Sequence, residues 1–463
     1  MSGQPAGKET REERFFYPWE RTLDRLVTPF EEFIHRQTTS GMILLATSVV
    51  AVVLANSPLR DAYLHLTHTP VAFRIGGAAL EMSWLHLVNE GLMVFFFFIV
   101  GLEIKRELWV GELSEPRKAL LPILAALGGM LTPAIFYTSF NLSGEFARGW
   151  GIPMATDIAF CVSALVLLGR RIPQALTIFL VSLAIVDDIG AVIVIAVFYT
   201  QSIHLAALGW AALVFAVLIS FNLSGIRRTL PYALAGGVLW ILMFQSGVHA
   251  TITGILVAFC IPARARYSPD SFHANLEGLI ARYRASSGKD KNVLTNTELQ
   301  SVLNRLDDEV RLADSPLRRM EDRMHLPVAL LVIPIFALTN AGIEMEWGSI
   351  AGTLRHPVTV GVVSGLFLGK MAGIFLFSWA GIRLGIVSLP SGATLRHLLG
   401  VGFLGGIGFT MSIFIAELSF PGNREALVMA KSGIMLASLL SALAGYLWLR
   451  FLCPKPIPAR PTG

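Results

Sequence analysis

The feature that most constrains this chain is a succession of long apolar stretches. A segment of about 17 to 25 predominantly apolar residues is long enough to cross a bilayer as a helix. By this criterion we find about twelve segments, near residues 42–57, 84–102, 119–138, 150–169, 174–199, 204–222, 230–245, 247–262, 326–343, 357–380, 396–416 and 425–451. Hydrophobic residues make up 54% of the 463 and charged residues only 15%, which excludes an ordinary soluble protein. The sequence therefore predicts an all-α polytopic membrane protein.

The basic residues predict how the chain crosses the bilayer. Most of the 37 Lys and Arg residues fall in the termini and in the connections that share a side with them. Cytoplasmic segments carry such an excess, so we expect both termini to be cytoplasmic and the number of spans to be even. Because the positive charge follows the topology, it gives no support to nucleic-acid binding.

The expected domain organisation is one transmembrane domain over residues 42–452 with short polar ends. Residues 1–41 are predicted to form a cytoplasmic amphipathic arm, since they lack the apolar core of a cleavable signal peptide. Residues 453–463 are predicted to be a cytoplasmic tail. Residues 263–325 are the longest polar stretch inside the domain, and we expect one or two cytoplasmic helices there.

One outer connection has the pattern of paired strands. Residues 71–82 contain two short strand-like runs around Gly76 and Gly77, which fits a small extracytoplasmic β-hairpin. An isolated hairpin is only marginally stable, so we expect it to pair with another structure, and a second protomer in a homodimer is the candidate. An irregular loop is the alternative.

Two adjacent carboxylates, Asp187 and Asp188, interrupt the span near 174–199, in "LAIVDDIGAVIVIAVFYT". A charged side chain at the bilayer centre costs at least ~2.5 to 3.5 kcal/mol, and such residues mark ion or proton pathways. Snorkelling to the interface fails for Asp188, because Asp is short and about a dozen apolar residues follow it. Adjacent helical residues point about 100° apart, so we expect one carboxylate to face a cavity and the other a neighbouring helix.

Other ionisable residues lie inside the predicted spans. Lys370, in "GLFLGKMAGIFLFSW", is the candidate partner of the Asp pair because a buried charge needs compensation. For Lys431, near a span end, snorkelling is the favoured interpretation, and for Glu90 it competes evenly with a functional role. A carboxylate that can hold either a proton or a hard cation is already an exchange site.

Glycine and proline interrupt two further spans. Gly149, Gly151 and Pro153 precede Asp157, and "GVGFLGGIGFTMSIF" places five glycines in the eleventh span. Interrupted helices are tolerated at membrane depth only where they are buried in protein or line a cavity, so we predict discontinuous helices 4 and 11. These are the middle members of spans 3–5 and 10–12, which run in opposite senses. The arrangement predicts an inverted repeat whose broken helices meet near the bilayer midplane.

At "ATDIAF", "LAIVDDIGA", "GLEIKREL" and "GGIGFTMSIFIA" the chain closely resembles the NhaA family of bacterial Na+/H+ antiporters. The resemblance implies a multi-pass protein of the bacterial cell inner membrane that serves pH homeostasis and salt tolerance and needs no cofactor. It implies exchange of internal Na+ or Li+ for external H+ by alternating access. The exchange would be pH-regulated and, with two H+ per Na+, electrogenic.

The same motifs imply roles for individual residues. Asp188 matches the central carboxylate for the cation and the proton, Asp187 lies beside it at the site of the transported Na+, and Lys370 matches the partner of Asp187. Asp157 and Thr156 match residues that balance the charges of the half-helix ends. A group linked to pH response is implied at Glu103, Arg106, Glu107, His249 and Glu321. By charge alone, an ordinary juxtamembrane ion-pair network is the alternative for this group.

Other functions stay open on the sequence alone. A Na+-coupled solute symporter could share the architecture, and Lys370 argues against it only weakly. An intramembrane aspartyl protease needs two aspartates from separate helices that share a proton. Its Gly-x-Gly-Asp motif is absent, although Asp157 with Asp188 could mimic the pair. A prenyl transferase would need a further acid shortly after Asp188, and none follows, so we expect a transporter rather than an enzyme.

Overall fold

The computed structural model of the chain describes residues 37–75, 78–200, 203–264, 269–286, 296–344 and 350–454. Within these ranges nine helices are long and apolar enough to cross a bilayer. Two bent helix pairs raise the number to as many as eleven: α2 (Gln37–Ala55) with α3 (Arg60–His68), and α19 (Leu395–Gly405) with α20 (Phe409–Ser419). The all-helical polytopic class is thereby confirmed, while the count of twelve spans and the inverted repeat stay predictions.

The nine long helices follow the predicted apolar stretches, with several of them assembled from shorter segments. They cover Trp84–Trp109 (ending in α5, Met93–Trp109), Pro116–Phe140 (α6), Glu145–Val166 (ending in α7, Ile158–Val166), Gln174–Phe198 (α8), Leu205–Leu223 (α9), Thr229–Ser246 (α10), Pro316–Asn340 (α14, Pro316–Pro327, and α15, Ile333–Asn340), Pro357–Arg383 (α17, Pro357–Val363, and α18, Lys370–Arg383) and Arg424–Phe451 (α21).

Two boundaries differ from the prediction. The ninth span was expected to begin at residue 326, but its helix begins at Pro316, where the Ser315 side chain accepts from the Arg318 N–H and proline occupies the first turn. The apolar criterion found only the membrane-like part of this helix. The predicted eighth span contains α11 (Ile252–Cys260), whose nine residues are too few to cross a bilayer alone.

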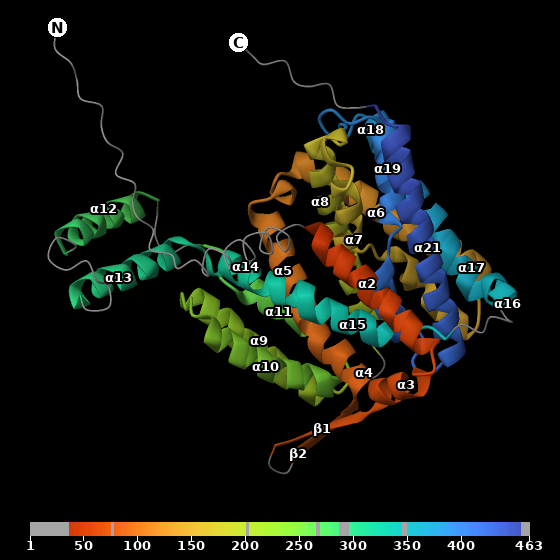
Figure 1. Cartoon of the computed structure of the whole chain (residues 1–463), viewed down its shortest axis with the longest axis horizontal. Helices are drawn as coiled ribbons and strands as arrows, with labels where there is room; N and C mark the ends of the chain where they lie inside the picture. Colours follow the sequence, from red (N-terminus) through yellow and green to blue (C-terminus); the bar gives the residue numbers. More distant parts are fainter. Residues whose placement is uncertain are drawn as a thin grey trace, which may run out of the picture.

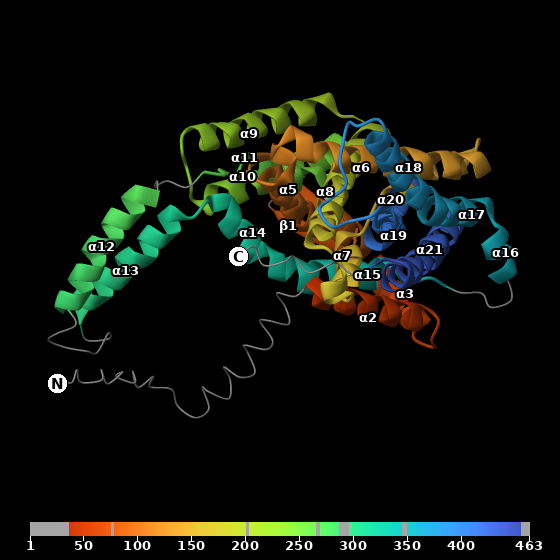
Figure 2. The ribbon, with the colours of Figure 1, turned by 90° about the horizontal axis from the view of Figure 1, so that it is seen from above.

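The predicted polar insert forms two helices of its own. α12 (Pro269–Ser286) and α13 (Thr297–Ala313) pack against each other and project from the rest of the molecule in both views (Figures 1 and 2). At another edge, strands β1 (Pro70–Ile75) and β2 (Ala78–Ser83) pair antiparallel beside α4 (Trp84–Leu87). Gly76, Gly77, residues 1–36 and residues 455–463 lie outside the described ranges. We call the side of the molecule with β1 and β2 the hairpin end.

The helices form two packed groups that carry different parts of the site. The bundle consists of α6, α7, α8 and α17 to α21, and it contains the interrupted helices. The flanking group consists of α2, α3, α5, α9, α10, α11, α14 and α15. The two groups meet where α2 packs against α7 and where α5 packs against α8. In Figure 1 the bundle lies on the right and α9 to α11 lie on the left.

Within the bundle, α6 and α18 approach each other through glycine. A Cβ at Gly373 would overlap the carbonyl oxygen of Gly128, whereas a Cβ at Gly237 on α10 would meet nothing within 4 Å. Small residues allow this close helix packing in membranes. We expect Gly373→Ala to lower the free energy of unfolding by about 1 to 3 kcal/mol, the usual cost of overpacking. Gly237→Ala is the matched control, and thermal midpoints in detergent would show the difference; equal midpoints would contradict the close approach.

Candidate functional site

The site is centred on α8, in whose 25 residues the Asp pair supplies the only charged side chains. Asp187 and Asp188 are each only 1% exposed, so both carboxylates are taken fully out of solvent. Because they follow each other on a helix, they point in different directions. Each therefore meets a different environment, and the two carboxylates are chemically unequal.

Asp187 faces Lys370, which has no exposed surface. The Lys370 Nζ donates to Asp187 Oδ2 at 2.5 Å and also donates to the carbonyl oxygen of Met154. Lys370 begins α18 directly after a π-helical segment, Ser364–Gly369, a distortion often found at functional sites. Met154 ends the short helix Glu145–Met154, so its carbonyl has no partner within that helix. The C-terminal end of a helix carries a partial negative charge, which favours a cation such as the Lys370 ammonium beside it.

The two interrupted helices cross where their breaks lie. Ala155, Thr156 and Asp157 separate the Glu145–Met154 helix from α7, and residues 406–408 separate α19 from α20 with a bend of 46°. The Asp157 N–H donates to the Ile407 carbonyl at 2.7 Å, and the Thr156 Oγ1 donates to the Gly405 carbonyl at 2.9 Å. The first break thus donates hydrogen bonds to carbonyl groups at the second, which lets non-helical backbone persist at this depth.

Asp157 caps two helices at once. One of its oxygens accepts from the Phe160 N–H of α7 at 3.2 Å. The other accepts from the Thr410 N–H at 3.1 Å and from the Thr410 Oγ1 at 2.5 Å, at the start of α20. Two helix N-termini therefore converge on one carboxylate, which their unpaired N–H groups and dipoles stabilise.

Asp188 has a different environment. Among the residues that the structure describes, neither of its carboxylate oxygens has a hydrogen-bond partner. It lines a cavity of about 100 Å3 whose polar lining also includes Glu103, Thr156, Asp157, His325 and Thr410. Such a volume holds several water molecules. Oxygen ligands of this kind suit a small hard cation, so the cavity can accommodate either a proton on Asp188 or a hydrated Na+.

Four of the five residues expected in the pH-response group gather at one end of α5. Arg106 pairs with Glu321 of α14 and lies 3.6 Å from Glu107. Glu107 also accepts from the Glu112 N–H at 3.1 Å. Glu103, about one turn before Arg106, lines the cavity that reaches Asp188. The cavity therefore extends from Asp188 toward the Arg106–Glu321 cluster, away from the hairpin end.

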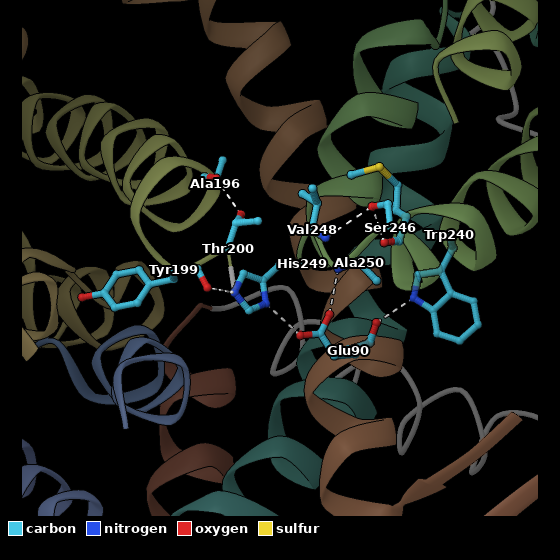
Figure 3. Close-up of polar contacts among 10 residues, drawn as sticks. Glu90, Ala196, Tyr199, Thr200, Trp240, Ser246, Val248, His249 and Ala250 are labelled. Carbon is cyan, nitrogen blue, oxygen red and sulfur yellow. Dashed lines mark hydrogen bonds and ion pairs between the residues drawn. The ribbon is translucent and has the colours of Figure 1, made fainter. Parts of the chain in front are cut away.

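His249, the fifth residue expected in this group, lies apart from the other four. Figure 3 shows it between Glu90 and the end of α8. Its Nδ1 lies 3.0 Å from Glu90 Oε1 and its Nε2 lies 3.0 Å from the Tyr199 carbonyl oxygen. Glu90 also accepts from the Ala250 N–H at 2.8 Å, and its carbonyl accepts from the Trp240 Nε1 at 2.7 Å. Glu90 lies near the start of the Trp84–Trp109 helix, so this cluster belongs to the hairpin end.

The snorkelling interpretation favoured for Lys431 is wrong, and of the two alternatives for Glu90 the snorkelling one does not hold. Glu90 is 6% exposed and makes the contacts just described. Lys431 is 7% exposed, and its Nζ pairs with Glu417 of α20 at 2.6 Å. Sequence reasoning did not single out Glu417, although it is the one acid between Thr410 and Ser419 in an otherwise apolar helix, which was the available signal.

Comparison with known proteins gives a consistent result. The family model described as Na+/H+ antiporter 1 matches residues 31–449. The chain is similar to a protein named Na(+)/H(+) antiporter NhaA from Sulfurimonas denitrificans, at 49% identity over 95% of this chain and 99% of the relative. A protein named NhaA 1 from Saccharophagus degradans is 48% identical over 93% of each chain, and one named NhaA from Syntrophobacter fumaroxidans is 49% identical over 81% of this chain and 80% of its own.

The Lys370–Asp187 pair makes a testable contribution to stability. Lys370→Met leaves the buried Asp187 carboxylate without its charge partner, which should cost about 3 to 5 kcal/mol. The double variant Asp187→Asn with Lys370→Met should recover much of this loss, because no uncompensated charge remains. Lys118→Met, which breaks the exposed Lys118–Glu115 pair, is the control and should leave the thermal midpoint nearly unchanged. A double variant no more stable than Lys370→Met would refute this account of the pair.

Proposed function

Since the chain belongs to the Na+/H+ antiporter 1 family, we propose that it exchanges internal Na+ or Li+ for external H+ at Asp188. One observation carries the assignment of the residue: both oxygens of Asp188 are buried, lack partners among the described residues and line the cavity. Asp187 and Asp157 are already engaged by Lys370 and Thr410. Asp188 is thus the carboxylate most available to a cation or a proton.

Family membership confirms the resemblance drawn from the four motifs. Such proteins are multi-pass bacterial membrane transporters that exchange Na+ and H+, so the chain is a transporter and not an enzyme. The protease and prenyl transferase alternatives are therefore excluded. A Na+-coupled symporter would need a pocket for an organic solute, typically about 300 to 1,000 Å3. The cavity beside Asp188 measures about 100 Å3, which favours an ion as the only cargo.

Competition at Asp188 supplies the exchange. With its proton released, Asp188 offers two anionic oxygens to Na+, while Thr156 and Thr410 contribute further oxygen atoms to the cavity lining. A proton arriving from the other side neutralises the carboxylate and releases the cation. The bundle that holds the two breaks then moves relative to the flanking group, so that the site opens first to one side and then to the other.

The stoichiometry of two H+ per Na+ requires a second proton carrier. The Asp187–Lys370 pair is the candidate, because the Lys370 ammonium can give up one proton and leave a neutral amine, so that the Asp187 carboxylate is free to face the incoming Na+. If Asp188 releases one proton and this pair releases the other as Na+ enters, each cycle moves one net charge. The electrogenic exchange that the family resemblance implies therefore has a physical source in the unequal environments of the two aspartates.

The orientation and the partners complete the proposal. We place the Arg106–Glu321 end and both termini in the cytoplasm, which agrees with the distribution of basic residues. The hairpin end then faces outward, where β1 and β2 would mediate a homodimer by pairing with a second protomer. The inner membrane of a bacterium is the proposed location, and the Arg106 cluster and His249 are proposed to link activity to pH.

Asp188→Asn tests the ion site directly. The amide cannot be deprotonated to bind Na+, so addition of Na+ or Li+ should no longer dissipate a respiration-generated pH gradient in inside-out vesicles. The control is Asp322→Asn, which alters an acid on α14 whose side chain is 70% exposed, and it should retain the response. Full activity of Asp188→Asn, measured with a fluorescent pH-gradient probe, would overturn the proposed site.

The contacts of His249 predict a pH dependence. Both of its neighbours, the Glu90 carboxylate and the Tyr199 carbonyl, are acceptors, so the ring satisfies both only when each nitrogen carries a proton. Glu90 is the one charged group with a recorded contact to His249 in the described chain, and it stabilises this protonated ring. Loss of the proton at alkaline pH weakens the contacts by which His249 joins Glu90 to the Tyr199 carbonyl at the end of α8, and this frees the bundle to move.

Glu90→Gln should therefore shift the rising limb of the pH–activity profile to lower pH by about one unit, because the ring gives up its proton more readily without the carboxylate. Initial rates of Na+-driven gradient dissipation across the neutral-to-alkaline range would measure the shift. Glu115→Gln, at an exposed carboxylate, is the matched control. An unchanged profile, or a shift toward higher pH, would rule out this role for the pair.

A further inference from the structure

Glu344 lies between two arginines at the hairpin end. Its Oε2 accepts from Arg60 at 2.5 Å, and its Oε1 accepts from Arg424. The Glu344 side chain is 21% exposed, compared with 51% for Arg60 and 67% for Arg424. The two ion pairs share one carboxylate, so removing Arg60 can serve as the control for removing Arg424.

The pair with Arg60 lies within the flanking group. Arg60 begins α3, which follows α2, and α2 packs against α15. Two hydrogen bonds fix the same elements: the Asn56 Nδ2 donates to the Ile343 carbonyl at 2.7 Å, and the Tyr63 hydroxyl donates to the Leu338 carbonyl at 2.7 Å. Breaking the Arg60 pair would therefore leave the relation between the two helix groups unchanged.

The pair with Arg424 joins the flanking group to the bundle. Arg424 begins α21, which packs against α17, α19 and α20. The preceding residue, Asn423, donates to Glu145 at 3.1 Å, on the short helix that leads to the first break. Any movement of the bundle that opens the hairpin end must separate Arg424 from Glu344.

The hairpin end is also where the path from the site is closed. Ile333 of α15 and Thr410 of α20 line the cavity. About one turn further toward the hairpin end, Phe414 of α20 contacts Phe336 of α15, with ring centroids 6.3 Å apart, and Phe97 of α5, at 5.4 Å. These three buried rings separate the cavity from the hairpin end, at the boundary between the two helix groups.

We propose that the Glu344–Arg424 pair is a latch that holds the hairpin end closed over the aromatic seal. This inference rests on the alternating-access part of the proposed function, in which the bundle moves relative to the flanking group. The latch stabilises the conformation whose cavity extends toward the Arg106–Glu321 cluster. Loss of the latch shifts the population toward the conformation open at the hairpin end.

The test measures access to a buried reporter. In a background with Cys161, Cys260 and Cys453 replaced by alanine, Ala337→Cys introduces one thiol next to Phe336, at a position that is 1% exposed. The probe is a membrane-impermeant maleimide added outside right-side-out vesicles. Arg424→Gln should raise the labelling rate about fivefold, the upper end of the range expected for loss of one largely exposed ion pair. Arg60→Gln, which removes an arginine from the same carboxylate, should leave the rate unchanged.

A conservative variant separates latching from other effects of replacing Arg424. Arg424→Lys keeps a positive charge opposite Glu344 and should keep labelling slow, whereas damage caused by loss of the arginine itself would raise labelling in both variants. Unchanged labelling of Arg424→Gln, or an equal increase in Arg60→Gln, would overturn the latch. Because labelling requires no ion exchange, its failure is distinct from failure of the Asp188 test, which would overturn the proposed function instead.

Discussion

The structure depends on how the ends of two broken helices are satisfied in an apolar interior. Each break exposes backbone groups that water would otherwise bind, and such groups are costly at membrane depth. Asp157 accepts from the starts of α7 and α20, and Lys370 donates to the end of the Glu145–Met154 helix. A negative charge therefore lies where N-termini converge and a positive charge where a C-terminus ends, which is the favourable sign at both places.

This arrangement makes the two aspartates of α8 different. The Lys370 ammonium donates a hydrogen bond to the Met154 carbonyl on one side and forms an ion pair with Asp187 on the other. Asp157 already accepts hydrogen bonds from Phe160 and Thr410. Within the described chain, Asp188 is left with unpaired oxygens in a small cavity, which is why we propose it as the group that binds the cation or the proton. The proposed ion site is thus available because its neighbouring charged groups already have partners.

The local parts of this arrangement could be predicted from the sequence, and the long-range parts only as candidates. Apolar length identified the helical class, and glycine and proline located the interruptions near Asp157 and Gly405. The facing directions of Asp187 and Asp188 followed from helix geometry. The partner of Lys431 was missed, because an ionisable residue near a span end looks the same whether it snorkels or pairs with a distant acid. The fold alone brought Glu417 beside it.

The two connections between helix groups at the hairpin end differ in the conditions to which they respond. Glu90 is buried and the His249 side chain is only 14% exposed, so salt screens their interaction weakly, but the His249 ring can gain or lose a proton. Arg424 is mostly exposed, so its pair with Glu344 is open to screening by external salt. Closure of the hairpin end would then be weakened by alkalinity through the first connection and by salinity through the second. Those are the two conditions under which exchange of internal Na+ for external H+ is most useful to a cell, and the two connections would report them independently.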